Sequence, residues 1–112
     1  MDIKELPNTL DELLQLSSNQ LLVIKCGATW CTPCKEIKPF FHYLAENYPN
    51  VIFYDLDIDN TQFEHITTSL PITKIPTFVF IKNQSIINSI LYQPKNKNND
   101  KDSIESYISD NL

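Results

Sequence analysis

The middle of the chain alternates between two hydrophobic periods in an order that few folds accommodate. Residues 21–26 form a short apolar, β-branched run typical of a buried strand, and residues 51–58 form a second such run. Between them, residues 32–48 carry apolar side chains at helical spacing, which predicts an amphipathic helix with a kink at Pro39. A strand, a helix and a strand in this order predict a right-handed parallel crossover that packs a helix onto a sheet.

Two further helices are predicted by capping boxes. The sequence T-L-D-E from Thr9 and the sequence T-Q-F-E from Thr61 each place a hydroxyl three residues before a glutamate. In a capping box these two side chains satisfy backbone N–H groups at the start of a helix. We therefore predict helices over residues 9–18 and 61–68.

The last third of the chain predicts a hairpin and a helix. Residues 77–81 and 85–91 are expected to pair as strands joined by residues 82–84. Residues 93–101 are polar and low in complexity, which predicts a mobile loop. A terminal helix should follow, with an apolar face formed by Ile104, Tyr107, Ile108 and Leu112. Taken together, the pattern predicts an α/β domain whose sheet is covered by helices on both faces.

The length and the charge of the chain indicate how many domains, which binding partners and which cellular compartment to expect. The 112 residues suit a single domain over residues 1–112. The formal net charge is −5, and all nine basic residues are lysine, so neither nucleic acid nor an anionic membrane surface is an expected partner. The longest apolar run, residues 21–24, is too short to span a bilayer, and the acidic N-terminus does not resemble a signal peptide. We expect a soluble protein of a reducing compartment: the cytoplasm, or the host cytoplasm or virion if its AT-rich coding bias reflects a virus.

The chemistry of the chain is concentrated in Cys31-Thr32-Pro33-Cys34. This segment lies where a predicted strand ends and the long helix begins. Cys31 is then placed at the helix N-terminus, where free N–H groups and the helix dipole favour a thiolate. Cys34 lies one turn further on the same face, within reach of a disulfide, and Pro33 is tolerated in the first turn. The spacing predicts that Cys31 attacks and that Cys34 resolves.

A structural cysteine pair, or half of a zinc site, is the alternative interpretation. Zinc needs four ligands, and the chain has no second CxxC motif. His42 and His65 are remote from the cysteines in sequence and are expected to be solvated on helices. Cys26 lies among apolar residues of a predicted strand, so we expect it to be a buried, inert thiol. We predict no metal site.

Four segments in the right order resemble the thioredoxin family. Residues 28–35 (ATWCTPCK) resemble its active-site signature, with Thr32 in place of the usual glycine. Residues 37–41 resemble the kinked helix that follows, and residues 57–59 resemble the acidic end of the third strand. Residues 75–78 resemble the cis-proline segment that faces the cysteines. The resemblance covers essentially the whole chain.

The resemblance implies both a fold and an activity. The fold is the thioredoxin fold, a central mixed five-stranded sheet flanked by four helices. The activity is dithiol–disulfide exchange on protein substrates, in which Cys31 attacks and Cys34 displaces the reduced product. No bound cofactor is implied. The oxidised form would be recharged by an external reductase, such as a thioredoxin reductase, or by a small thiol.

The resemblance also implies roles around the cysteine pair. Trp30 would form a wall of the site, and Asp59 would accept a hydrogen bond from its indole N–H. Pro76 would follow a cis peptide bond, and the backbone of Ile75 would pair with the substrate chain. Thr32 and Pro33 would tune the reduction potential from between the two cysteines.

The chain departs from the family at the position of its buried acid. Six residues before the nucleophile, where thioredoxins carry that acid, this chain has Lys25. Asp55 occupies the neighbouring-strand position, so we predict a Lys25–Asp55 pair beneath the cysteines. A cation there would favour the thiolate of Cys34, whereas a neutral lysine would accept its proton. Lys25 is otherwise interpreted as a snorkelling residue without chemistry.

A second departure concerns the substrate groove. The glycine that follows the last strand in the family, and that forms one wall of the groove, is replaced here by Leu91-Tyr92-Gln93. A glycine in the hairpin turn is also absent. The bulkier rim predicts an altered substrate set.

These observations lead to one functional prediction and two alternatives. We predict a monomeric protein disulfide reductase that supports electron transport and cell redox homeostasis. A thioredoxin-like binding or chaperone module with vestigial cysteines is the first alternative, favoured by Lys25 and the bulky rim. An oxidase or isomerase is the second, and Pro33 argues against it.

Overall fold

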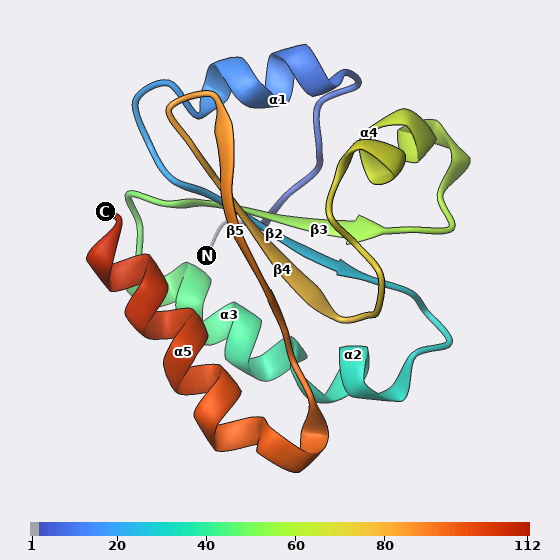
Figure 1. Cartoon of the computed structure of the whole chain (residues 1–112), viewed down its shortest axis with the longest axis vertical. Coiled ribbons are helices and arrows are strands. Elements are labelled where there is room, and N and C mark those ends of the chain that lie inside the picture. The colour runs from blue at the N-terminus through green and yellow to red at the C-terminus, as the bar shows by residue number, and fades with distance from the viewer. Residues whose placement is uncertain (1–2) are drawn as a thin grey trace.

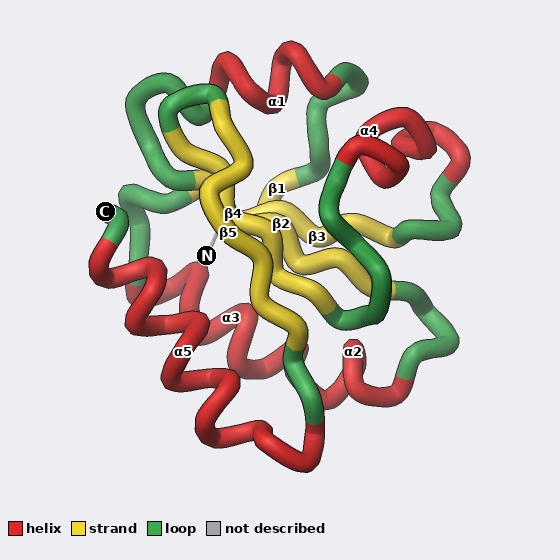
Figure 2. The backbone as a smooth tube through the Cα atoms, viewed as in Figure 1, coloured by secondary structure: helices red, strands yellow, loops and turns green. Residues whose placement is uncertain are grey.

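A mixed five-stranded sheet forms the centre of the computed structural model, which describes residues 3–112. The strands lie in the order β1-β3-β2-β4-β5 (Figure 2). Strands β1, β3 and β2 are parallel, and β4 and β5 are antiparallel to their neighbours. The strands are β1 Ile3–Lys4, β2 Leu22–Gly27, β3 Ile52–Asp57, β4 Thr77–Lys82 and β5 Ser85–Leu91. The predicted mixed sheet is therefore confirmed, although the sequence pattern alone had not identified β1.

Helices cover both faces of the sheet, as predicted (Figure 1). Helices α1 and α4 lie on one face, and α3 and α5 lie on the other. The helices are α1 Leu10–Leu16, α2 Thr32–Glu36, α3 Lys38–Asn47, α4 Glu64–Ser69 and α5 Lys97–Asp110, with 3-10 turns at Thr61–Phe63 and Pro94–Asn96. Because α2 and α3 together form the predicted kinked helix, the four expected helices are present. None of the helices in residues 3–112 is both long and apolar enough to cross a bilayer.

The predicted kink is a complete break between α2 and α3. Pro39 has no N–H to donate to the carbonyl of Lys35, and its ring crowds that carbonyl. The helix therefore ends at Glu36 and restarts at Lys38. The N–H of Phe41 donates to the carbonyl of Ile37 at 3.0 Å, so the chain regains helical hydrogen bonding at once. The break lets the short helix α2 present the cysteines while α3 packs on the sheet.

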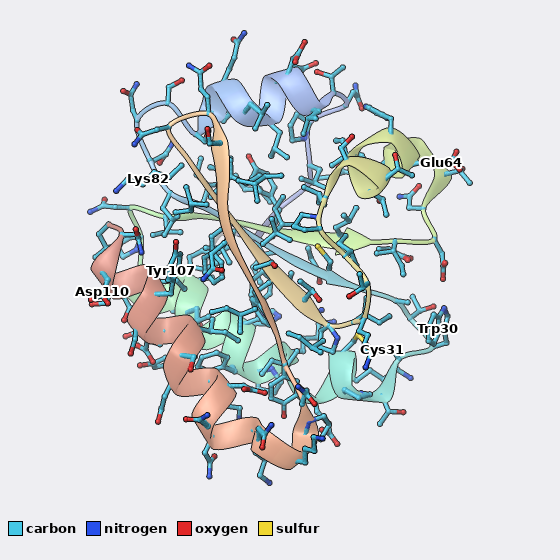
Figure 3. The ribbon with its side chains drawn as sticks, viewed as in Figure 1. Trp30, Cys31, Glu64, Lys82, Tyr107 and Asp110 are labelled. Carbon is cyan, nitrogen blue, oxygen red and sulfur yellow. A yellow bond between two sulfur atoms is a disulfide. The ribbon has the colours of Figure 1, made fainter. Side chains whose placement is uncertain are left out.

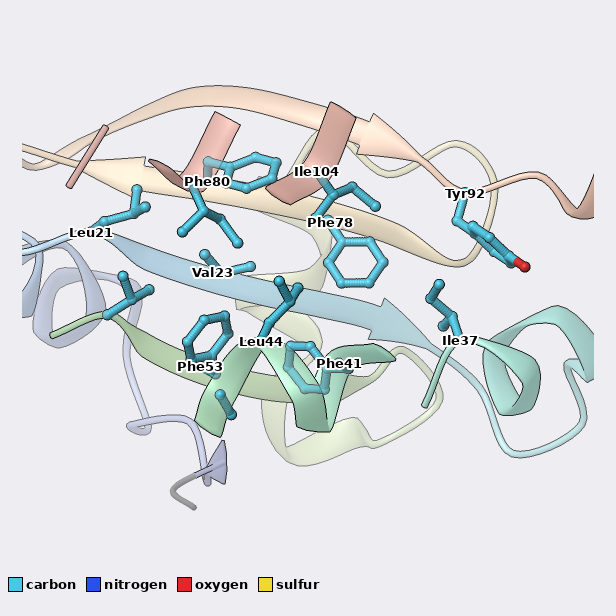
Figure 4. Close-up of a cluster of buried hydrophobic side chains, with 13 residues drawn as sticks. Leu21, Val23, Ile37, Phe41, Leu44, Phe53, Phe78, Phe80, Tyr92 and Ile104 are labelled. Carbon is cyan, nitrogen blue, oxygen red and sulfur yellow. The ribbon is translucent and has the colours of Figure 1, made fainter. Parts of the chain in front are cut away.

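Two apolar layers hold the sheet between its helices. The layer under α3 and α5 is shown in Figure 4 and contains Val23, Phe41, Leu44, Phe53, Phe78, Phe80, Ile104 and Ile108. The opposite layer contains Leu13, Leu22, Ile24, Leu56, Phe63, Ile66, Val79 and Ile81. Strands β2 and β4 contribute to both layers, which explains their nearly continuous apolar sequence.

The two capping boxes have different outcomes. The hydroxyl of Thr9 accepts a hydrogen bond from the N–H of Glu12 at 3.1 Å, as predicted. The second helical segment is capped by Asn60 instead of Thr61, because the Asn60 side chain accepts the N–H of Gln62 at 3.1 Å. Asparagine is as good an N-cap as threonine, so the start of the segment moves back by one residue.

The predicted mobile loop at residues 93–101 is wrong. The segment begins with a 3-10 turn and enters α5 at Lys97. The carboxylate of Asp100 accepts the N–H of Gln93 at 2.8 Å, which fixes the start of the segment. Burial of Ile104 and Ile108 further along α5 anchors the polar first turns, so tertiary packing overrides local composition. Leu112, expected on the apolar face, lies beyond the helix and is exposed.

The predicted β4–β5 hairpin is confirmed and needs no glycine in its turn. Asn83 and Gln84 adopt φ values of 52° and 65°, the left-handed region that two-residue hairpin turns require. The N–H of Asn83 donates to the carbonyl of Ser17 at 2.8 Å, and the N–H of Gln84 donates to the Ser17 hydroxyl at 2.9 Å. These bonds to the end of α1 offset the cost of the left-handed conformation.

Candidate active site

The two cysteines lie where the central strand β2 leads into α2, beyond the carboxyl end of that strand. Cys31 is labelled in Figure 3. Cys31 is the N-cap of α2, and Cys34 lies in the first turn. The two residues form a disulfide across a Cα–Cα distance of 5.3 Å. The backbone N–H of Cys34 also donates to Cys31 Sγ at 3.2 Å. A donor aimed at this sulfur favours its thiolate form when the disulfide is reduced.

Trp30 stands beside the disulfide as an exposed aromatic wall. Its side chain is 67% exposed and lies at the rim of the site (Figure 3). The indole N–H donates to the carboxylate of Asp59 at 2.7 Å, which confirms the contact expected from the sequence. The N–H of Asp59 in turn donates to the carboxylate of Asp57 at 2.9 Å. The orientation of the ring is therefore set by the end of β3.

A cis peptide bond joins Ile75 to Pro76, as the resemblance predicted. Ile75 packs against the small buried cluster that includes Cys31 and Cys34. The carbonyl of Pro76 accepts the N–H of Tyr92 at 3.0 Å, which ties the segment to the end of β5. The segment before β4 thus lies beside the disulfide.

The predicted pair beneath the cysteines is present. Lys25 and Asp55 are register partners on β2 and β3, and Lys25 Nζ lies 3.3 Å from Asp55 Oδ1. The lysine side chain is 7% exposed, whereas the aspartate side chain is 41% exposed. Both residues line a cavity of about 410 Å³ that also reaches Cys34. Lys25, at the position where the family carries an acid, therefore lies buried beside Cys34.

The bulky rim is confirmed as the wall of a groove. Leu91, Tyr92 and Gln93 line a groove of about 380 Å³ together with Pro33 and Ile75. Two exposed lysines and a proline that the sequence reasoning had not singled out also line it: Lys74, Lys95 and Pro94. A second hollow of about 620 Å³ lies between Trp30 and the segment after α4. The disulfide is thus flanked by two shallow surfaces.

Thr32 and the two histidines differ in their exposure to solvent. Thr32 is exposed at the start of α2, and His65 is exposed on α4, whereas His42 is half-buried on α3 instead of fully solvated. Among residues 3–112, no group of three or more histidine, cysteine or acidic side chains could hold a metal ion.

Cys26 is expected to resist alkylation in the folded protein. Its side chain is fully buried in β2, and burial, with a smaller contribution from Asp55, raises the pKa of its thiol to about 12. With this pKa about one Cys26 thiol in ten thousand would be ionised at pH 8. Since only the thiolate reacts with an alkylating reagent, labelling of Cys26 should be very slow. Mass spectrometry after reduction and iodoacetamide treatment should show label on the CxxC pair and none on Cys26 until urea is added. Equal labelling of Cys26 in the native protein would contradict its burial.

Comparisons with known proteins agree with this geometry. The family model described as "Thioredoxin" matches residues 4–110. The thioredoxin of Ophiophagus hannah is 36% identical over 95 residues, which cover 85% of this chain and 87% of that protein. The thioredoxin of Homo sapiens is 42% identical over 78 residues, covering 70% and 72% of the two chains.

Solved structures show the same fold over nearly the whole chain. Mitochondrial thioredoxin 3 from Saccharomyces cerevisiae, in its oxidised form, has a TM-score of 0.78 at 32% identity and covers 96% of this chain and 94% of its own. Schistosoma mansoni thioredoxin has a TM-score of 0.81 at 31% identity and covers 99% and 96%. Since family model, relatives and fold agree around a closely spaced cysteine pair, the chain belongs to the thioredoxin family and is a thiol–disulfide oxidoreductase that reduces protein disulfides.

Proposed function

We propose that Cys31 is the nucleophile of this reductase and Cys34 its resolving cysteine. The observation that carries the assignment is the hydrogen bond from the Cys34 N–H to Cys31 Sγ at the start of α2. Only the first sulfur of the pair receives a backbone donor of this kind among the described residues. In the reduced protein this donor stabilises negative charge on Cys31 and leaves Cys34 as the second thiol to ionise.

The proposed reaction transfers two electrons from the cysteine pair to the substrate. The Cys31 thiolate attacks one sulfur of the substrate disulfide, which breaks the substrate S–S bond and forms a mixed disulfide. The first substrate sulfur leaves as a thiolate and takes a proton from water. The Cys34 thiolate then attacks Cys31 Sγ, which closes the Cys31–Cys34 disulfide and releases the second substrate sulfur.

The surrounding residues hold the substrate in this proposal. Trp30, oriented by Asp59, forms one wall, and its exposed ring offers apolar contact next to Cys31. No hydrogen bond within residues 3–112 occupies the backbone of Ile75, so that its peptide groups are available to pair with an extended substrate chain. Thr32 and Pro33 separate the two cysteines and tune the potential of the couple.

Protein disulfides are the substrates of the family, and reductases are its partners in general. We infer that residues 1–112 act as one monomeric domain and that an external reductase or a small thiol recharges it. A reducing compartment such as the cytoplasm suits a chain that keeps Cys26 as a free thiol.

Reduction of insulin by dithiothreitol tests the assignment. The wild-type protein should accelerate insulin precipitation, and Cys31→Ser should return the rate to that of dithiothreitol alone, because no nucleophile remains. Cys26→Ser is the matched control: it removes a cysteine of the same chain, and we expect its rate to equal that of the wild type. A wild-type protein without turnover would instead support a thioredoxin-like binding module.

A further inference from the structure

The buried side chain of Lys25 lies close to Cys34, the proposed resolving cysteine. On the α3 face of the sheet, the neighbouring strands β2 and β3 carry Val23 beside Phe53 in the apolar layer, and Lys25 beside Asp55 one step closer to the cysteines. The Lys25 ammonium also lies 5.9 Å from the centre of the Phe41 ring, on the face that attracts a cation. The side chain is therefore held in place at the end of the apolar core by Asp55 and the Phe41 ring.

Gly27 shows how near this ammonium is to Cys34. A methyl group placed on Gly27 would lie 2.9 Å from Cys34 Sγ and 4.0 Å from Lys25 Nζ. The sulfur and the ammonium thus both lie close to one point, which stays open because Gly27 has no side chain.

Asp55 holds the Lys25 ammonium in place but only partly offsets its electrostatic effect on Cys34 Sγ. The carboxylate is substantially exposed, so water screens its charge, whereas the lysine is almost fully enclosed. The other charged groups that line the cavity are Lys35 on α2, Lys38 on α3 and Asp57 at the end of β3. Lys35 and Lys38 are exposed and Asp57 is half-buried, which leaves Lys25 as the least screened charge near the sulfur.

We propose that Lys25 stabilises the thiolate of Cys34 directly and that Asp55 positions Lys25 for this purpose. In the resolving step Cys34 loses its proton to water in the cavity, the ammonium balances the resulting charge, and the thiolate attacks Cys31 Sγ to expel the substrate thiolate. An acid at this position would accept the proton itself, whereas the lysine stabilises the thiolate while water accepts the proton. This inference rests on the proposed division of roles between the two cysteines.

The titration of Cys34 tests the proposal. In a Cys26→Ser, Cys31→Ala background Cys34 is the only thiol, and its ionisation can be followed by thiolate absorbance at 240 nm. Lys25→Met keeps the length of the side chain and removes the charge, so the ratio of thiolate to thiol at a given pH should fall at least about tenfold. Asp55→Asn keeps an amide oxygen that can accept the hydrogen bond from Lys25 Nζ, so the lysine stays in position, and it removes the opposing charge, so it should raise that ratio. Lys97→Met changes net charge equally on the exposed start of α5, and we expect no shift.

Opposite shifts in the two variants distinguish an electrostatic role from a structural one. Loss of a structural ion pair would lower stability in both variants and would not move the titration of Cys34 in opposite directions. An unchanged titration in Lys25→Met, or shifts of the same sign, would overturn the proposal. If Lys25→Met does not fold, Lys25→Arg is the variant to titrate. It retains the positive charge, so its Cys34 titration should equal that of the parent protein.

Turnover separates this inference from the proposed function. In the otherwise wild-type protein, Lys25→Met should lose insulin reduction more strongly at pH 6 than at pH 8, because fewer Cys34 thiols are ionised at low pH. If wild-type turnover is normal and the two pH profiles coincide, the role of Lys25 fails and the reductase remains. If wild-type turnover is absent while Cys34 titration still depends on Lys25, the proposed function fails and the electrostatic role remains.

Discussion

Cys34→Ser should leave the protein covalently attached to its substrate. The variant keeps Cys31 and its hydrogen-bond donor, so attack on a substrate disulfide proceeds. Without Cys34 the mixed disulfide is broken only by thiols from solution. A neighbouring group held in place acts at an effective concentration of about 10⁵ M or more, so release by a thiol at about 10⁻³ M should be slower by about 10⁸-fold. Non-reducing electrophoresis after incubation with a protein disulfide should show the accumulated complex.

The control for this trapping is the double variant Cys31→Ser, Cys34→Ser. It still contains Cys26, which is buried and free in the structure. No complex should form, because Cys26 does not reach the substrate. If the double variant accumulates complex like the single variant, the attacking sulfur is not Cys31.

The site was more predictable than some of the elements that carry it. Cys31 and Cys34 are close in sequence, so helical geometry alone places them together. The Lys25–Asp55 pair could be predicted because two adjacent parallel strands fix the register of their residues. The contact of Trp30 with Asp59 joins residues far apart in sequence, and it was accessible only through the resemblance to a family.

The unpredicted features depend on tertiary packing. Residues 97–101 are polar and contain no helix signal of their own, but Ile104 and Ile108 anchor the rest of α5 on the sheet. Strand β1 has only two residues, which is too short for a period-two pattern, and it exists because β3 offers a free edge. Lys74 and Lys95 come together in the groove because two loops meet beside Pro33. No pattern within either segment predicts that these two segments lie next to each other.

Phe41→Ala should destabilise the protein by about 3–5 kcal/mol, a large part of the roughly 5–15 kcal/mol that stabilises a domain of this kind. The ring is fully buried and makes edge-on contacts with Phe53 and Phe78, at centroid distances of 5.8 and 5.9 Å (Figure 4). Its removal leaves a cavity that strands β3 and β4 cannot close by themselves. Urea unfolding followed by tryptophan fluorescence would measure the loss as a lower midpoint.

The neighbouring Phe40 provides the matched control, because it is on the same helix but only half-buried. Phe40→Ala should cost less than half as much, since less apolar surface returns to water. Phe41 is also the aromatic face beneath Lys25 Nζ, so the same substitution should loosen the ammonium that faces Cys34. Equal costs for the two alanine variants would mean that the layer between α3 and the sheet is not the main support of the fold. Because the apolar layer and Lys25 share this ring, the packing of α3 also supports the lysine to which we assign the stabilisation of the Cys34 thiolate.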